Sequence, residues 1–183
     1  MFNIPNLLAL SRIIIAPIML YVIITPELFT DAGMHISWSY YSAALLFVIA
    51  STTDFFDGYI ARELDQITTL GKILDPLADK MLVIAAFLGL MISNSDYIWA
   101  IYIILVRELF ITGLRTVAVS EGMDIAASMA GKVKTVVQMI AIGFLLMHWS
   151  GGEVLLWIAV AITLYSAFEY IFAFTKEYKR VSL

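Results

Sequence analysis

Six long apolar segments dominate this chain of 183 residues. A helix that crosses the hydrocarbon core of a bilayer needs about 20 mostly apolar residues. The segments that meet this length are residues 7–24, 38–60, 76–93, 97–119, 129–149 and 154–174. Their apolar residues run continuously rather than alternating, which favours helices over the strands of a barrel. The sequence therefore predicts an all-α integral membrane protein, a bundle of six transmembrane helices that forms a single domain over residues 1–183.

The composition supports a membrane protein. Hydrophobic residues make up 62 % of the chain and charged residues 14 %, whereas a soluble domain carries about 25 % charged residues. The net charge of −4 gives no reason to expect a nucleic-acid partner, and the absence of cysteine excludes disulfides and thiolate metal sites. The first residues lack the basic region of a cleavable signal peptide, so the first apolar segment is expected to remain as a helix.

The basic residues predict how the chain is oriented in the membrane. The loops at residues 26–37, 94–96 and 150–153 contain no lysine or arginine. All eleven basic residues fall on the other side of the expected bundle. Because cytoplasmic loops are enriched in lysine and arginine, both termini and the polar region between the second and third helices are expected to face the cytosol, at the cell membrane. The tryptophans lie near the opposite helix ends, as interfacial residues do: Trp38, Trp99, Trp149 and Trp157.

Four aspartates lie at the junction of the second and third predicted helices. Asp54 and Asp57 are three residues apart, and Asp75 and Asp79 are four apart. Residues at these spacings share a helix face, so two neighbouring helices can direct four carboxylates toward one point. Clustered carboxylates repel one another and resist ionisation, and a divalent cation removes that conflict. Oxygen ligands without histidine or cysteine favour Mg²⁺ or Mn²⁺.

A simpler interpretation is that each aspartate pairs with a local cation at a hydrated helix end. Arg62, Lys72 and Lys80 are the available partners. Asp75 also directly precedes Pro76, a pattern typical of a helix N-terminus, so a capping role is a further possibility. Capping does not exclude metal binding. Charged residues within membrane segments are usually functional, which favours the metal hypothesis.

The acidic segment resembles a family signature. It reads DFFDGYIARELDQITTLGKILDPLAD from Asp54 to Asp79. It is similar to the signature D-x2-D-G-x2-A-R-x8-G-x3-D-x3-D of the CDP-alcohol phosphotransferase family and matches it at every fixed position. The resemblance covers nearly the whole chain, because six helices is that family's architecture. It implies an enzyme that moves a phosphatidyl group from a CDP-activated lipid onto an alcohol and releases CMP, in a polar active-site cavity that faces the cytosol.

The resemblance also implies roles for individual residues. Two divalent cations, Mg²⁺ or Mn²⁺, would bind at the four aspartates, with Asp54 and Asp75 contacting both ions. Asp57 would complete one metal site and Asp79 the other. Asp79 would also take the proton of the acceptor hydroxyl as general base. The positions that would contact the CDP moiety of CDP-diacylglycerol are Gly58, Arg62 and Thr68.

Three further stretches are similar to the family members that use sn-glycerol 3-phosphate as the acceptor. They are NIPNLLALSRI, VRELFITGLR and GKVKTVVQM. An arginine within a lipid-facing span is costly, so Arg107 is expected to face the bundle interior or a hydrated cavity. A pocket for the acceptor phosphate is expected from four cations: Arg107, Arg115, Lys132 and Lys134. Lys132 and Lys134 also fit an ordinary cytosolic loop, and Glu108 is expected to pair with a nearby arginine rather than take part in chemistry.

Other functions stay open at this point. Related enzymes that make cardiolipin or a phosphatidylinositol phosphate would share several of these features. A small transporter coupled to a cation would also carry carboxylates within membrane helices, although it would often show repeated halves, and no repeat is visible here. The family resemblance adds the expectation of a homodimer.

Overall fold

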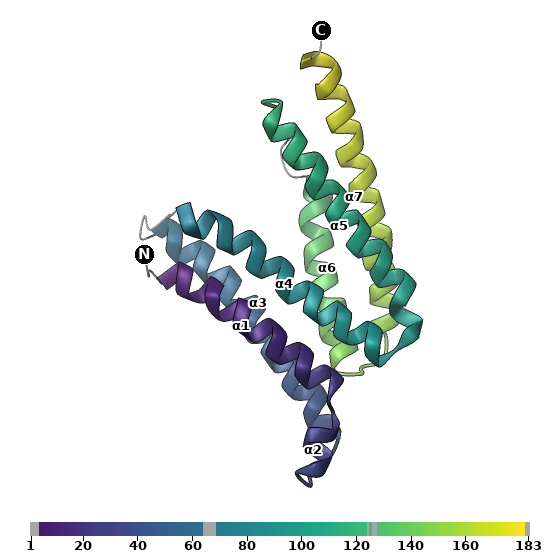
Figure 1. The fold of residues 1–183 in the computed structure, drawn as a ribbon. Helices are drawn as coiled ribbons and strands as arrows, with labels where there is room; N and C mark the ends of the chain where they lie inside the picture. Colours follow the sequence, from purple (N-terminus) through teal and green to yellow (C-terminus); the bar gives the residue numbers. More distant parts are fainter. Residues whose placement is uncertain (1–3, 64–68, 124, 126–127, 182–183) are drawn as a thin grey trace. The chain divides into compact units, whose positions relative to one another are not determined.

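The computed structural model describes residues 4–63, 69–123, 125 and 128–181, and these residues form helices and short connections without any strand. Figure 1 shows their order along the chain. The elements are α1 (Ile4–Ile24), α2 (Glu27–Asp31), α3 (Ser37–Glu63), α4 (Thr69–Ser93), the 3₁₀ helix η1 (Ser95–Tyr97), α5 (Ile98–Ser120), α6 (Met129–Leu146) and α7 (Gly152–Val181). Each of the six apolar segments thus coincides with one long helix, except that residue 97 belongs to η1 and residues 147–149 follow the end of α6. The helix α2 is a short helix in the first loop.

Five helical segments are long and apolar enough to cross a membrane in the part of the chain that was described. They are Asn6–Ile24, Pro76–Ser93, Ser95–Ser120, Met129–Leu146 and Gly152–Arg180. The helix α3, which covers the second segment expected to span, is not among them. The structure therefore confirms an all-helical architecture with five candidate spans in its described residues, and the sixth span stays a prediction.

The helices form two compact units. One contains Met1–Ser95 together with Ile142–Trp149, and the other contains Asp96–Ala141 together with Ser150–Leu183. The first unit is built on α1, α3 and α4, with the last turn of α6, and the second on α5, α7 and most of α6.

In the first unit, α1 packs against both α3 and α4, as Figure 1 shows. Alanine is the commonest buried residue of these helices: Ala9 and Ala16 on α1, Ala43, Ala44 and Ala50 on α3, and Ala78, Ala85 and Ala86 on α4. Small side chains let helix backbones approach closely, which is how helices associate in lipid.

The helices α1 and α4 approach each other closely at Gly89. A Cβ atom on this residue would lie 2.8 Å from a side-chain carbon of Ile23. A contact that short would force neighbouring atoms to shift, so a glycine suits the point where the two helices meet. A hydrogen bond of 2.9 Å from the hydroxyl of Ser39 to the carbonyl of Val22 joins α3 to α1.

In the second unit, α5 packs against α7. Ile111, Ala167 and Tyr170 form a buried cluster between these helices. The buried residues of α7 recur every three or four positions, at Leu156, Ala159, Val160, Thr163, Ser166, Ala167 and Tyr170. One stripe of the helix therefore faces its neighbours, and two of the residues on it, Thr163 and Ser166, are polar.

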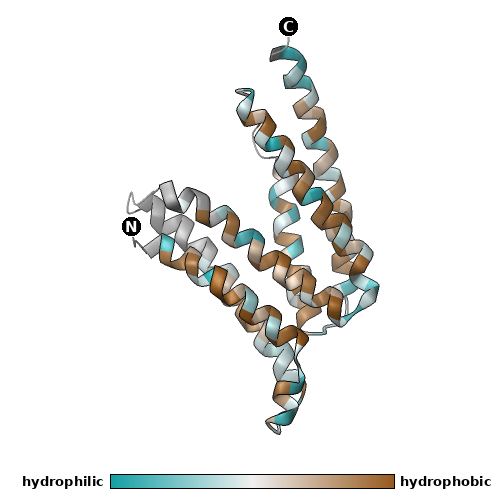
Figure 2. Ribbon diagram, in the orientation of Figure 1, coloured by the Kyte–Doolittle hydropathy of each residue, from teal (hydrophilic) through white to brown (hydrophobic). Residues whose placement is uncertain are grey.

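Apolar side chains also cover much of the outer surface. Figure 2 shows hydrophobic residues along the length of the helices. All four tryptophans are largely exposed, from 46 % for Trp157 to 71 % for Trp99. Exposed apolar surface on this scale is typical of a protein whose solvent is lipid.

Candidate functional site

The acidic motif lies on two consecutive helices of the first unit. Asp54 and Asp57 are in the last turns of α3, and Asp75 and Asp79 are in the first three turns of α4. The helices α3 and α4 contact each other, and both contact α1. The expectation that the two pairs lie on neighbouring helices is thus confirmed.

Most side chains of the motif are outside the described part of the structure. Thr68 lies outside the described residues altogether. For five further residues of the proposed metal and nucleotide sites the structure describes the helix but not the side chain: Asp54, Asp57, Gly58, Arg62 and Asp75. The metal and CDP assignments of these residues stay predictions.

The capping role considered for Asp75 is wrong. The helix α4 begins at Thr69, six residues before Asp75, so Pro76 lies inside the helix rather than at its start. Proline has no backbone N–H, so its position removes one hydrogen bond from the helix interior. Asp75 therefore lies within α4, about one turn before Asp79.

Asp79 is the motif aspartate whose side chain is described, and it forms an ion pair with Arg12 of α1. The Arg12 Nη1 atom donates a hydrogen bond to the Asp79 Oδ1 atom. The Arg12 side chain is completely buried, whereas the Asp79 side chain is 43 % exposed. A buried arginine needs an anionic partner, and Asp79 supplies one across 67 positions of sequence.

Arg12 is a residue that sequence reasoning missed. It was counted only among the basic residues that set the orientation. The available signal was its place within the first apolar segment, because a charged residue inside a membrane span usually faces a partner. The sequence does not say which of the several acids that partner is.

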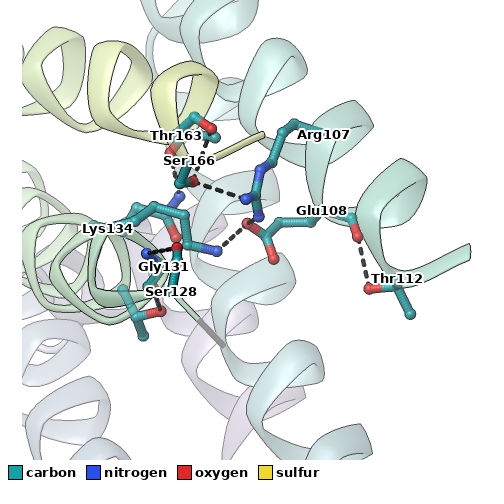
Figure 3. Close-up of polar contacts among 10 residues, drawn as sticks. Arg107, Glu108, Thr112, Ser128, Gly131, Lys134, Thr163 and Ser166 are labelled. Atoms are coloured by element: carbon teal, nitrogen blue, oxygen red, sulfur yellow. Dashed lines mark hydrogen bonds and ion pairs between the residues drawn. The ribbon is translucent and has the colours of Figure 1, made fainter. Parts of the chain in front are cut away.

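The second unit holds a polar cluster that connects α5, α6 and α7 (Figure 3). The Arg107 Nη1 atom lies 3.2 Å from the Glu108 Oε1 atom. The Lys134 ammonium group donates to the same Glu108 oxygen. The side chains of Arg107 and Lys134 are only 10 % and 8 % exposed, and that of Glu108 is 30 % exposed. Two cations from two helices, Lys134 buried and Arg107 mostly buried, thus converge on one carboxylate, as their burial requires.

The local sequence explains why Lys134 reaches this cluster. The hydroxyl of Ser128 accepts a hydrogen bond of 3.1 Å from the backbone N–H of Gly131, which is an N-cap arrangement for α6. The cap fixes where α6 begins. Lys134 is buried and Lys132, two positions earlier, is exposed. Residues two apart on a helix do not face each other.

Of the four cations expected to bind the acceptor phosphate, the structure places two on one carboxylate. Arg107 and Lys134 meet at Glu108. Arg115 instead lies over the ring of Tyr170, with its guanidinium carbon 5.8 Å from the ring centroid. Lys132 makes no ion pair with a described residue. The expectation that Glu108 pairs with a nearby arginine is confirmed, and its second partner, Lys134, was not foreseen.

A groove of about 300 Å³ runs beside the cluster in the same unit. Arg107 and apolar residues of α5 and α7 line it, among them Tyr102, Phe110, Leu164 and Phe168. Its walls are almost entirely apolar, so it does not have the polar character expected of a cavity that binds a phosphate.

Comparison with known proteins shows the family to which this chain belongs. Residues 2–165 match the family model for CDP-alcohol phosphatidyltransferase. Three relatives share the name CDP-diacylglycerol–glycerol-3-phosphate 3-phosphatidyltransferase. The Bacillus subtilis protein is 41 % identical over 93 % of this chain and 94 % of its own length. The Escherichia coli K12 protein is 36 % identical, with 94 % of each chain covered. The Rickettsia felis protein is 34 % identical, with 96 % of this chain and 97 % of its own length covered.

The family model covers nearly all of the first compact unit and the second unit as far as residue 165, and it includes the complete acidic motif. The family resemblance drawn from the motif is confirmed by this match and by the full-length similarity of the relatives. The chain belongs to the CDP-alcohol phosphatidyltransferase family.

Proposed function

We propose that this chain transfers the phosphatidyl group of CDP-diacylglycerol to sn-glycerol 3-phosphate. A hydroxyl oxygen of glycerol 3-phosphate attacks the phosphorus that carries the diacylglycerol, the bond from that phosphorus to CMP breaks, and the hydroxyl proton leaves to a base. The products are phosphatidylglycerophosphate and CMP, so the reaction serves phospholipid biosynthesis. The observation that carries this proposal is the 34–41 % identity, over nearly the full chain, to relatives named for this reaction.

The acidic motif supports a dependence on divalent cations. Its four aspartates supply only hard oxygen donors, which suits Mg²⁺ or Mn²⁺. The residues that would hold two such ions are Asp54, Asp57, Asp75 and Asp79. The described side chain of Asp79 fits this role, because 43 % of it is accessible while its Oδ1 atom bonds to Arg12. Bound ions would withdraw charge from the pyrophosphate of the lipid substrate.

Asp79 is proposed to accept the proton of the attacking hydroxyl. Arg12 supports this assignment, because its guanidinium group holds one carboxylate oxygen in a fixed direction. A base must lie within hydrogen-bond reach of the proton that it accepts. The ion pair with α1 therefore restricts where Asp79 can point.

The CDP moiety is proposed to bind at Gly58, Arg62 and Thr68. The family signature supports these positions. The guanidinium group of Arg62 would form charge-assisted hydrogen bonds with a phosphate group of the nucleotide, and Gly58 would let the nucleotide approach the backbone.

The acceptor phosphate is proposed to bind at Arg107, Lys134, Arg115 and Lys132. Two of these, Arg107 and Lys134, already lie together on one carboxylate, and both side chains are mostly shielded from solvent. A phosphate group offers several acceptor oxygens to such donors. With Glu108 included, these three side chains carry a net charge of +1, which favours an anionic substrate.

The remaining proposals concern the membrane. The helix α3 is proposed as the sixth span, since its 27 residues exceed the about 20 that a span requires. The distribution of lysine and arginine supports cytosolic termini and a cytosolic active site. A homodimer is proposed from the family resemblance.

A panel of acceptors tests the proposed function. The purified protein, with CDP-diacylglycerol and Mg²⁺ or Mn²⁺, is offered glycerol 3-phosphate, phosphatidylglycerol and inositol phosphate in separate reactions. Phosphatidyl transfer to glycerol 3-phosphate alone supports the proposal. Preference for phosphatidylglycerol would instead indicate cardiolipin synthesis, and preference for inositol phosphate would indicate synthesis of a phosphatidylinositol phosphate. Because the reaction is run in detergent without a gradient, a transporter would release no CMP.

A further inference from the structure

The hydroxyl group of Ser166 has both of its hydrogen-bonding functions fixed. It donates its proton to the carbonyl of Thr163, 3.0 Å away on the same helix. Its oxygen accepts a hydrogen bond of 2.7 Å from the Arg107 Nη2 atom (Figure 3). A serine in a helix interior commonly donates to a carbonyl one turn back, and here that bond leaves the oxygen lone pairs free to face Arg107. Ser166 is 1 % exposed, so water does not compete for either bond.

Arg107 is held from two sides and still has a free donor. Glu108 accepts from its Nη1 atom and Ser166 from its Nη2 atom. Its Nε atom is buried and has no hydrogen-bond partner among the described residues. A buried donor without a partner is costly and uncommon in folded proteins. A guanidinium group that is fixed in orientation but incompletely bonded is suited to a ligand with several acceptor oxygens.

We infer that Ser166 is a positioning residue of the acceptor-phosphate site, which sets the direction of the Arg107 guanidinium group from α7. This inference rests on the proposed function, and it adds a residue outside the four cations. Ser166 itself does not touch the substrate. Its loss leaves Arg107 in place but lets the guanidinium group turn toward Glu108, its other partner. Binding of the phosphate weakens, while the reacting groups at the acidic motif are unchanged.

Thr163 provides a matched control on the same helix. Its hydroxyl accepts a hydrogen bond of 2.9 Å from the Nε2 atom of Gln138 on α6, and the threonine is fully buried. Thr163→Val removes this bond between helices but keeps the backbone carbonyl that accepts from Ser166. The two variants Ser166→Ala and Thr163→Val thus each remove one buried hydroxyl, and only the first removes a direct contact with Arg107.

The experiment measures the steady-state kinetics of four proteins: wild type, Ser166→Ala, Ser166→Thr and Thr163→Val. Thermal unfolding in the same detergent is measured in parallel. Ser166→Ala is expected to raise the KM for glycerol 3-phosphate about tenfold, the effect of losing one hydrogen bond to a charged group. Its kcat and its KM for CDP-diacylglycerol are expected to stay within about twofold of wild type. Ser166→Thr, which keeps the hydroxyl, is expected to restore most of the affinity for glycerol 3-phosphate.

The control separates positioning from stability. Thr163→Val is expected to lower the unfolding temperature at least as much as Ser166→Ala and to leave the KM for glycerol 3-phosphate unchanged. If the two variants raise this KM equally, or if Ser166→Ala lowers only kcat, Ser166 does not position Arg107 for the phosphate. If wild type transfers nothing to glycerol 3-phosphate, the proposed function fails and this inference fails with it.

Discussion

The two residues of the ion pair between Arg12 and Asp79 are expected to differ in how much their substitution destabilises the protein. Asp79→Asn removes a carboxylate that compensates the charge of the completely buried Arg12 guanidinium group. Removal of one partner from a buried ion pair costs about 3–5 kcal/mol. Asp79 is 43 % exposed and asparagine still offers an oxygen acceptor, so the expected cost falls below that range, at about 2–3 kcal/mol.

The opposite substitution is expected to be mild. Arg12→Met replaces the buried charge by an apolar side chain of similar length and leaves the partly exposed Asp79 accessible to water. Replacement of a buried charge by a well-packed apolar residue is often neutral. The double variant Arg12→Met/Asp79→Asn is therefore expected to recover most of the stability that Asp79→Asn loses.

Thermal unfolding in detergent measures this difference. For a chain of this size, 1 kcal/mol corresponds to about 2–4 °C in the unfolding temperature. Asp79→Asn is expected to unfold about 4–12 °C below wild type, with Arg12→Met and the double variant close to wild type. If Arg12→Met is the less stable of the two single variants, or if the double variant loses the sum of both effects, Arg12 and Asp79 do not act as the pair described.

Two further predictions test packing and the phosphate site. Gly89→Val places a Cβ within 2.8–3.0 Å of Ile23 atoms, and this overpacking is expected to cost about 1–3 kcal/mol of unfolding free energy. The control variant Gly143→Ala, where a Cβ meets nothing within 4 Å, should unfold at or slightly above the wild-type temperature. Equal losses of stability in both variants would show that the contact between α1 and α4 is not tight. Arg115→Ala removes one of the cations proposed to bind the acceptor phosphate and is expected to raise the KM for glycerol 3-phosphate about tenfold; an equal rise in the KM for CDP-diacylglycerol would contradict that role.

The six helices were predictable because their apolar runs are long and continuous, but their ends were not. The sequence predicts a helix that starts at Pro76, since proline commonly occupies a first turn and polar residues precede it. The helix α4 instead begins at Thr69. The helix α4 packs against α1 and α3, and hydropathy does not register such tertiary contacts.

The residue types of the candidate site were predictable from the sequence, but which charged residues form ion pairs was only partly predictable. Spacing placed the two aspartate pairs on the ends of neighbouring helices, and an acid next to an arginine predicted the pair of Glu108 with Arg107. The contacts between Arg12 and Asp79, and between Lys134 and Glu108, join residues 67 and 26 positions apart. Pairs this distant in sequence depend on how the helices pack, which a single sequence does not specify.

The pairing of residues at the proposed phosphate site was also only partly predictable from the sequence. Lys132 and Lys134 were grouped because they are close in sequence. On a helix, residues two apart lie on different faces, and only Lys134 is buried at Glu108. The period of the helix could have separated these two lysines before the structure was known. The bonds that Ser166 makes to Arg107 and to Thr163 depend on the packing of α7 and had no signal in the sequence.

We propose that this chain is a phosphatidyltransferase that depends on divalent cations at its acidic motif. The most direct test is incorporation of labelled glycerol 3-phosphate into lipid by the purified protein, measured together with CMP release in the presence of Mg²⁺ or Mn²⁺ and after chelation with EDTA. We predict one CMP for each labelled lipid formed, and no product once the metal is removed. Absence of labelled lipid with every divalent cation, or full activity in EDTA, would contradict the account.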